Sequence, residues 1–248
     1  MDIHIVIASE RIGEWMGLPI TNTLLTSWIV MGILVVFALV VSRMLTYKPG
    51  RVQNAVEGLF AFVLDFMTEA FEGNRKHALF FFPLIATIFL FVWLANWMEF
   101  LPGFGSIGVT GDCGRAVCEP LFRSVNTDLN VTIALAVIAV MVTEVAGIVA
   151  LGLWRYTGKF LVFTSPLKFF IGLIELVSEA SRLISFSFRL FGNIFAGEAL
   201  IVVMMYFLPV GLPIPFMLFE MFVGFMQAAI FALLTLFFIK LAMTPAQH

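Results

Sequence analysis

The chain has 248 residues, of which 61% are hydrophobic and only 12% are charged. An average soluble domain is about 45–50% apolar and about 25% charged, so this composition indicates an integral membrane protein. With 14 Lys and Arg against 16 Asp and Glu, the chain has no basic field for nucleic acid. Two cysteines exclude a disulfide-rich scaffold, and 29 phenylalanines argue against disorder. Continuous apolar runs, without the alternation of a membrane β-barrel, predict an all-α polytopic protein.

Five or six membrane-embedded helices are expected along the chain. After an N-terminal segment (1–23), the first apolar run reaches from Leu24 to Leu45, and it defines a transmembrane helix at 24–46. The next segment, 47–78, is too polar to span comfortably. Its acidic residues fall on one side at helical spacing, which predicts an amphipathic helix on the membrane surface or a hairpin folded into the membrane.

Residues 79–248 are expected to form the main helical unit. A second span covers 79–101, and a polar loop at 102–128 carries Cys113 and Cys118, whose spacing would suit a small disulfide outside the cell. A third span follows at 129–154. Two long helices are predicted at 166–208 and 216–243, separated by a proline-rich hinge. The first of them would be about 66 Å long at 1.5 Å per residue, so it must be strongly tilted or divided in two.

Apart from Arg182 and Arg189, the basic residues divide unevenly between the two sides of the membrane. Nine lie on one side, and three (Arg11, Arg115 and Arg123) lie on the other. The nine are Arg43, Lys48, Arg51, Arg75, Lys76, Arg155, Lys159, Lys168 and Lys240. The positive-inside rule places the larger group in the cytoplasm, so the N-terminus is expected outside and the C-terminus inside. The start of the chain has no recognisable cleavable signal peptide.

The two long helices carry ionisable residues, which are costly in a membrane and are therefore functional candidates. One stripe at helical spacing contains Glu175, Ser178, Arg182, Ser185, Arg189 and Asn193. Arg182 could simply pair with Glu179 or Glu175. In the last helix, Glu220, Gly224 and Gln227 share one face.

An antiparallel arrangement of these helices would give two polar routes. It would place Gln227 level with Arg189, and Glu198 level with Glu220 about 13 Å further outward. One route would rise from the cytoplasm to Arg189, and the other would descend from outside. Arginine keeps its charge at any working pH, so Arg189 would block direct proton passage and attract a carboxylate on a moving partner.

Several motifs resemble those of the a subunit of F-type ATP synthase, the stator subunit that faces the rotating c-ring. The most specific is Ser-Phe-Arg-Leu-Phe-Gly-Asn-Ile-Phe-Ala-Gly-Glu at 187–198. Three others are Asn-Trp-Met-Glu-Phe-Leu-Pro at 96–102, Asp-Leu-Asn-Val-Thr at 128–132 and Gln-Ala-Ala-Ile-Phe at 227–231. The similarity is recognisable from about Leu79 to the end.

The resemblance implies a role for each matching residue. Arg189 would be the essential arginine opposite the c-ring carboxylate. Asn193, Glu198 and Gln227 would line the outer half-channel, and Glu175 and Ser178 the cytoplasmic one. Relatives often pair a Glu with a His where this chain has Glu198 and Glu220, so the outer relay would here be two carboxylates. Implied partners are the c-ring, the b/b′-type peripheral stalk, lipid and protons, in the inner membrane of a bacterium, with no nucleic acid.

Less specific readings stay open for several residues. Glu99 and Asp128 lie at predicted helix ends, which favours caps or loop anchors, and Glu144 could face a channel or bond a neighbour. No phosphate loop, zinc motif or nucleophile elbow is present, so no cofactor and no ATP site are expected. The coupling ion is expected to be the proton, with sodium as an alternative. An independent secondary transporter or a non-conducting scaffold are other classes, although a transporter would be expected to show repeated halves.

Overall fold

A computed structural model describes residues 9, 11–15, 18–47, 49–101, 108–109, 119–158, 166–208 and 211–244. Cys113 and Cys118 lie outside these ranges, so their disulfide stays a prediction. The elements are β1 (Arg11–Trp15), β2 (Leu18–Thr21), α1 (Asn22–Met44), α2 (Arg51–Ala70), α3 (Arg75–Met98), β3 (Gly108–Val109), β4 (Glu119–Pro120), η1 (Val125–Thr127), α4 (Leu129–Leu151), α5 (Leu153–Thr157), α6 (Pro166–Phe207) and α7 (Pro213–Met243).

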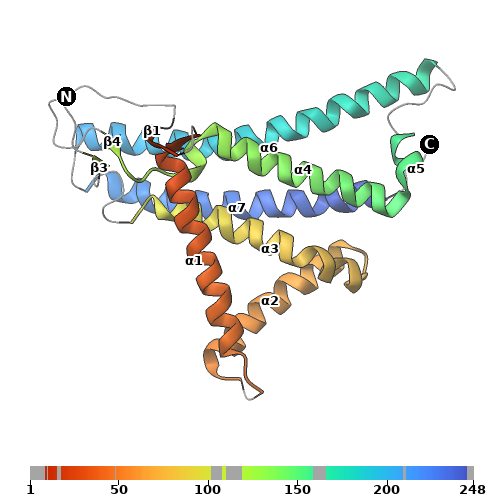
Figure 1. Ribbon diagram of the computed structural model, residues 1–248, viewed down its shortest axis with the longest axis horizontal. Helices are drawn as coiled ribbons and strands as arrows, with labels where there is room; N and C mark the ends of the chain where they lie inside the picture. The colour runs from red at the N-terminus through yellow and green to blue at the C-terminus, as the bar shows by residue number, and fades with distance from the viewer. Residues whose placement is uncertain are drawn as a thin grey trace.

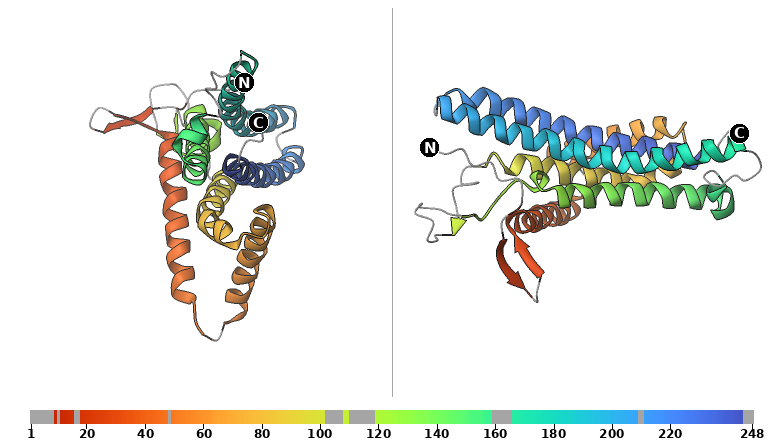
Figure 2. Two further views of the ribbon diagram at one scale, coloured as in Figure 1. Left: turned by 90° about the vertical axis from the view of Figure 1, so that its right-hand side faces the viewer. Right: turned by 90° about the horizontal axis from the view of Figure 1, so that it is seen from above.

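The long helices form one bundle with a single outlying arm. Helices α3, α4, α6 and α7 run alongside one another, whereas α1 leaves the bundle at a large angle (Figure 1). Helix α2 returns from the far end of α1 to the bundle and packs against α3. The left panel of Figure 2 looks along the bundle and shows α1 projecting from it. Within the described residues, five helices (α1, α3, α4, α6 and α7) are long and apolar enough to cross a membrane. The predicted all-α polytopic fold is therefore confirmed.

Helix α6 is a single uninterrupted helix of 42 residues, which decides between the two alternatives for this segment. Its length is about 63 Å at 1.5 Å per residue, roughly twice the hydrocarbon core of a bilayer. An uninterrupted helix of this length fits the membrane only when it is steeply inclined to the membrane normal. Figure 1 shows a large angle between α1 and the bundle. If α1 stands parallel to the membrane normal, the bundle that contains α6 is therefore strongly tilted.

Two helix ends differ from the boundaries predicted from the sequence, and a proline or a glycine explains each difference. Helix α7 begins at Pro213, three residues before the predicted start, because the first turn of a helix needs no N–H donor and tolerates both Pro213 and Pro215. The third span ends at Leu151, earlier than predicted, because Gly152 adopts a φ of 83° and starts the short helix α5. The N-terminal segment contains an antiparallel hairpin, β1–β2, which the sequence pattern does not indicate.

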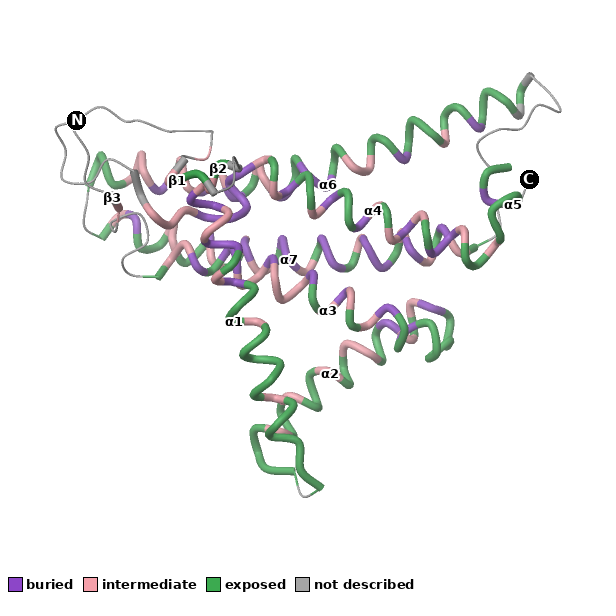
Figure 3. The backbone as a smooth tube through the Cα atoms, in the orientation of Figure 1, coloured by how far each residue is buried: buried purple, intermediate pink, exposed green. Residues whose placement is uncertain are grey.

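The core lies between α3, α4, α6 and α7, and α7 contributes the most fully buried side chains. Phe231, Leu236 and Ile239 are almost completely buried there, in apolar clusters that also contain residues of α3 and α4. Figure 3 shows the contrast between α7, which has buried residues along its whole length, and the largely exposed α1. Apolar side chains such as Val36 and Leu39 of α1 are more than half exposed, as expected for a surface that faces lipid.

Asp128 joins the start of α4 to the start of α1. Its Oδ1 accepts a hydrogen bond from the Asn130 backbone N–H at 2.9 Å, and its Oδ2 accepts one from the Thr23 hydroxyl at 2.8 Å. These bonds confirm the predicted capping role. We expect Asp128→Ala to destabilise the solubilised protein by about 1–2 kcal/mol, because it removes a helix cap and the hydrogen bond that joins α4 to Thr23 of α1.

The measurement for Asp128→Ala is the midpoint of thermal unfolding in detergent. Asn54→Ala, at an exposed position of α2, provides the control and should leave the midpoint unchanged. Equal midpoints for Asp128→Ala and the parent protein would show that this cap contributes nothing to stability.

Candidate functional site

Helices α6 and α7 form the predicted antiparallel hairpin and bring their polar residues together. Asn193 Nδ2 donates a hydrogen bond to Gln227 Oε1 at 2.8 Å. Nearer the hairpin turn, the carboxyl group of Glu220 lies directly against the Cα of Gly197, where any side chain would overlap it. Glu220 is therefore level with the Gly197–Glu198 pair, as the antiparallel arrangement predicts.

Arg189 lies on the open face of α6, at one end of a polar cavity. The cavity has a volume of about 410 Å³ and also runs along the half of α6 that precedes Arg189. Its walls are formed by Ser178, Ser181, Arg182, Ser185, Phe186, Arg189, Leu234 and Phe238. Four residues of the predicted stripe (Ser178, Arg182, Ser185 and Arg189) thus share one hollow. Glu175 is half-buried and lies outside this lining.

Arg182 is engaged by its neighbours, unlike the exposed Arg189. Its Nη1 lies 3.6 Å from Oε1 of the buried Glu179. Its guanidinium carbon also lies 4.7 Å from the centroid of the Phe238 ring, which is a cation–π geometry. The structure thus favours the structural reading of Arg182, as a partner of Glu179.

A second cation, Arg123, lies beside Glu198 at the opposite end of the bundle. Arg123 Nη2 is 3.7 Å from Glu198 Oε2, and only 10% of the Arg123 side chain is exposed. From the sequence, Arg123 is merely one of three external charges in a polar loop. The contact with Glu198 depends on the path of the segment between β4 and η1, which the sequence pattern does not predict.

Asn96 and Asn126 connect α3, α7 and the η1 turn at the same end. Asn96 Nδ2 donates to the Gly224 carbonyl at 2.9 Å, and Asn126 Nδ2 donates to Asn96 Oδ1 at 2.6 Å. Gly224 permits this close approach, because an added Cβ would lie 3.0 Å from the Cβ of Asn96. Three segments that are far apart in sequence thus meet at this end of the bundle.

Glu99, which directly follows α3, is half-buried near Glu198, Glu220 and Arg123. Burial, followed by the negative charge of Glu198, raises the pKa of Glu99 to about 8, whereas the positive charge of Arg123 lowers it. Glu99 is the C-cap residue of α3, so its predicted place as a helix cap is confirmed, whereas its electrostatic setting was not predicted. Its neighbours come from α6, α7 and the loop after β4, which a sequence pattern does not bring together.

Glu144 bonds a neighbour, which settles the alternative left open for it. The Tyr156 hydroxyl of α5 donates to Glu144 Oε2 at 2.8 Å. Its ring lies against Gly147, where an added Cβ would overlap it. Burial and this hydrogen bond raise the pKa of Tyr156. Tyr156 therefore fastens α5 to the end of α4.

Several buried polar atoms at the hairpin end have no hydrogen-bond partner among the described residues. They are Trp93 Nε1, Asn126 Oδ1, Glu220 Oε1 and Gln227 Nε2. Buried polar atoms of this kind are usually satisfied by water, because leaving them unpaired is costly. Together with Glu198 and Arg123, these atoms make the hairpin end of the bundle a second polar region.

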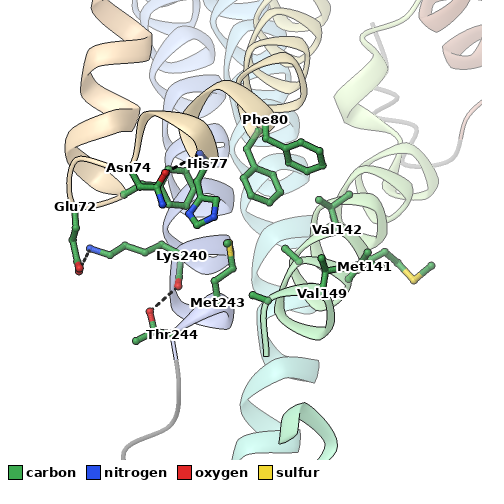
Figure 4. Close-up of a pocket in the computed structure, with 15 residues that line it drawn as sticks. Glu72, Asn74, His77, Phe80, Met141, Val142, Val149, Lys240, Met243 and Thr244 are labelled. Carbon is green, nitrogen blue, oxygen red and sulfur yellow. Dashed lines mark hydrogen bonds and ion pairs between the residues drawn. The ribbon is translucent and has the colours of Figure 1, made fainter. Parts of the chain in front are cut away.

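A larger cavity, of about 950 Å³, lies at the other end of the bundle (Figure 4). It is bordered by the turn between α2 and α3, by α4 and by the end of α7. There, Lys240 Nζ pairs with Glu72 Oε1 at 3.0 Å. None of the predicted site residues lines this cavity, so it is separate from the polar regions around Arg189.

Comparison with known proteins agrees with the resemblance indicated by the motifs. The family model described as "ATP synthase A chain" matches residues 24–240. A protein named ATP synthase subunit a from Moorella thermoacetica is 30% identical over 224 residues, covering 90% of each chain. Another of that name, from Geotalea daltonii, is 30% identical over 217 residues, covering 86% of this chain and 84% of the relative. The chain therefore belongs to the ATP synthase subunit a family.

Proposed function

We propose that this chain is the stator subunit that carries protons to and from the rotor ring of an F-type ATP synthase. The observation that carries the proposal is the position of Arg189 between two separate polar regions. On one side lies the cavity that contains Ser178 and Ser185. On the other lie the Asn193–Gln227 hydrogen bond and the Glu198–Glu220 region.

This arrangement would act as two offset half-channels. A proton would enter from outside through the polar region around Glu198 and Glu220 and pass Asn193 and Gln227. It would then neutralise a ring carboxylate and travel with the turning ring. It would leave toward the cytoplasm through the cavity that contains Ser178, and Glu175 would lie near the exit.

Arg189 would separate the two routes. Its permanent charge repels a proton that would otherwise pass directly between them, and it attracts the ionised ring carboxylate after release. Proton flow is thereby tied to rotation, since only a protonated and neutral ring site can leave the arginine and enter the lipid.

The proposed partners and placement follow the family. The ring of c subunits would lie against the open face of α6, and b/b′-type stalk subunits would hold this chain fixed in a bacterial inner membrane. Arg75, Lys76 and Lys240 lie at one end of the bundle and Arg123 at the other, which supports a cytoplasmic C-terminus under the positive-inside rule. The chain would bind no ATP, and nucleotide chemistry would belong to the other sector. Sodium is the alternative coupling ion, and proton pumping in sodium-free buffer would exclude it.

Cross-linking tests the stator role. We expect a cysteine at Ser185, on the exposed face of α6, to cross-link to the ring subunit in the purified complex when Cys113 and Cys118 are replaced by serine. A cysteine at Val36, on the exposed surface of α1, should give no such product. The product is identified by mass spectrometry. A ring cross-link from Val36 but not from Ser185 would contradict the proposed docking face.

A further inference from the structure

Three carboxyl groups from three different elements converge where the α6–α7 hairpin meets the end of α3. Glu99 follows α3, Glu198 belongs to α6 and Glu220 to α7. The Glu220 carboxyl rests on Gly197, next to Glu198. The charges of both Glu198 and Glu220 act on Glu99. Three ionised carboxylates gathered at one end of the bundle, partly or fully buried, would repel one another.

Arg123 is the cation that faces this group. Its guanidinium lies 3.7 Å from the Glu198 carboxylate, and its positive charge also acts on Glu99. The side chain is only 10% exposed, so water screens it little. Asp128 is nearby in sequence, but its carboxylate is occupied by Thr23 and Asn130 at the start of α4.

We propose that Arg123 is the counter-ion of Glu198 and Glu99 within the group that also contains Glu220, and that its charge sets the pH range over which this carboxylate group takes up and releases the transported proton. The inference rests on the proposed function, in which these residues border the outer route. Arg123 is a positioning residue in this scheme. It carries no proton itself, because a guanidinium stays protonated.

The proposal assigns different tasks to the two arginines. Arg189 is exposed on the open face of α6, where a moving partner can reach it. Arg123 is enclosed and already paired with a carboxylate of its own chain, so it cannot serve a passing ring site. Its charge instead offsets part of the negative charge of the three carboxylates. Without it, like-charge repulsion would favour the protonated state of the group.

The test is the dependence of ATP-driven pumping on pH at the outer face, in proteoliposomes that contain the whole complex. In this direction the carboxylate group must be deprotonated to accept a proton from the ring. The acid limb of the profile is the pH range below which pumping falls because the carboxylate group is already protonated. Arg123→Gln removes the cation that favours the ionised carboxylates, so this limb should move to higher pH, by about one unit or more. Arg123→Lys retains the charge and should keep the limb near its original position.

Charge compensation separates electrostatics from packing. The double variant Arg123→Gln/Glu99→Gln removes one cation and one carboxylate, and its acid limb should return toward that of the parent complex. It also provides a readout if Arg123→Gln alone does not assemble. A limb of Arg123→Gln that coincides with the parent profile would overturn the proposal, whatever the amplitude. A double variant with a limb as far displaced as that of Arg123→Gln would overturn it as well.

Arg189→Ala in the same vesicles distinguishes failure of this inference from failure of the proposed function. If Arg189→Ala abolishes pumping while Arg123→Gln leaves the pH profile unmoved, the half-channel scheme stands and only the role of Arg123 is refuted. If Arg189→Ala pumps normally, the proposed function itself fails.

Discussion

Arg189→Ala is expected to abolish ATP-driven acidification of inverted membrane vesicles, lowering the rate by about a hundredfold or more. The guanidinium is the charge that would receive the ionised ring carboxylate, and alanine offers no replacement for it. The same change removes the barrier between the two polar regions, so passive proton leakage through the assembled complex should increase. Quenching of a pH-sensitive dye measures both effects.

Assembly decides how the result for Arg189→Ala is interpreted. The variant must co-purify with the ring and the ATPase sector in parental amounts, since lost pumping has no mechanistic meaning otherwise. Arg43→Ala removes an exposed cation from the end of α1 and should pump normally. Undiminished pumping by assembled Arg189→Ala would refute the assignment of Arg189 and the two-half-channel scheme, leaving the scaffold and independent-transporter alternatives.

A single methyl group at Gly197 is expected to reduce pumping by about tenfold to a hundredfold. The Cβ of Gly197→Ala would overlap the Glu220 carboxyl group and displace it from the α6–α7 interface. Small displacements of a reacting group cost large factors in rate, because the transferred proton needs a donor and an acceptor within hydrogen-bonding distance. Initial rates of ATP-driven acidification give the effect.

A compensating change distinguishes this displacement from general damage. Glu220→Asp shortens the side chain by one methylene group, so Gly197→Ala/Glu220→Asp should recover part of the lost rate. Gly32→Ala provides the control, because a Cβ at Gly32 of α1 meets no atom within 4 Å. If Gly197→Ala pumps at the parental rate, close packing of Glu220 on α6 is irrelevant to transport.

Local chemistry made the membrane helices predictable. Apolar runs of about 20 residues specify helices in lipid, because each backbone polar group must be paired within its own segment. The same physics made Arg189, Asn193 and Glu220 visible as candidates, since polar residues are costly there and stand out against an apolar background. Helical periodicity then correctly placed Ser178, Arg182, Ser185 and Arg189 along one face.

Other features depended on contacts between distant segments. The partner of Arg123 is 75 positions away in sequence, and no periodicity links a loop to a helix face. The sequence did not predict that Gly197 lies against Glu220 or that Gly224 lies against Asn96. The tertiary structure shows both contacts. The start of α7 at Pro213 was missed because proline ends a helix interior but is accepted in a first turn.

The sequence by itself determined the all-α membrane class, the approximate spans and the family motif around Arg189. In lipid, each backbone polar group must be hydrogen-bonded within its own helix and each charged side chain is costly, so these features are visible in short stretches of sequence. The tertiary structure alone decided which polar groups meet. It placed Arg123 beside Glu198, brought Glu99 into the same group and bonded Asn193 to Gln227. Those contacts depend on helix packing and on the path of the loop before η1, and electrostatic interactions follow distance in space, not distance along the chain.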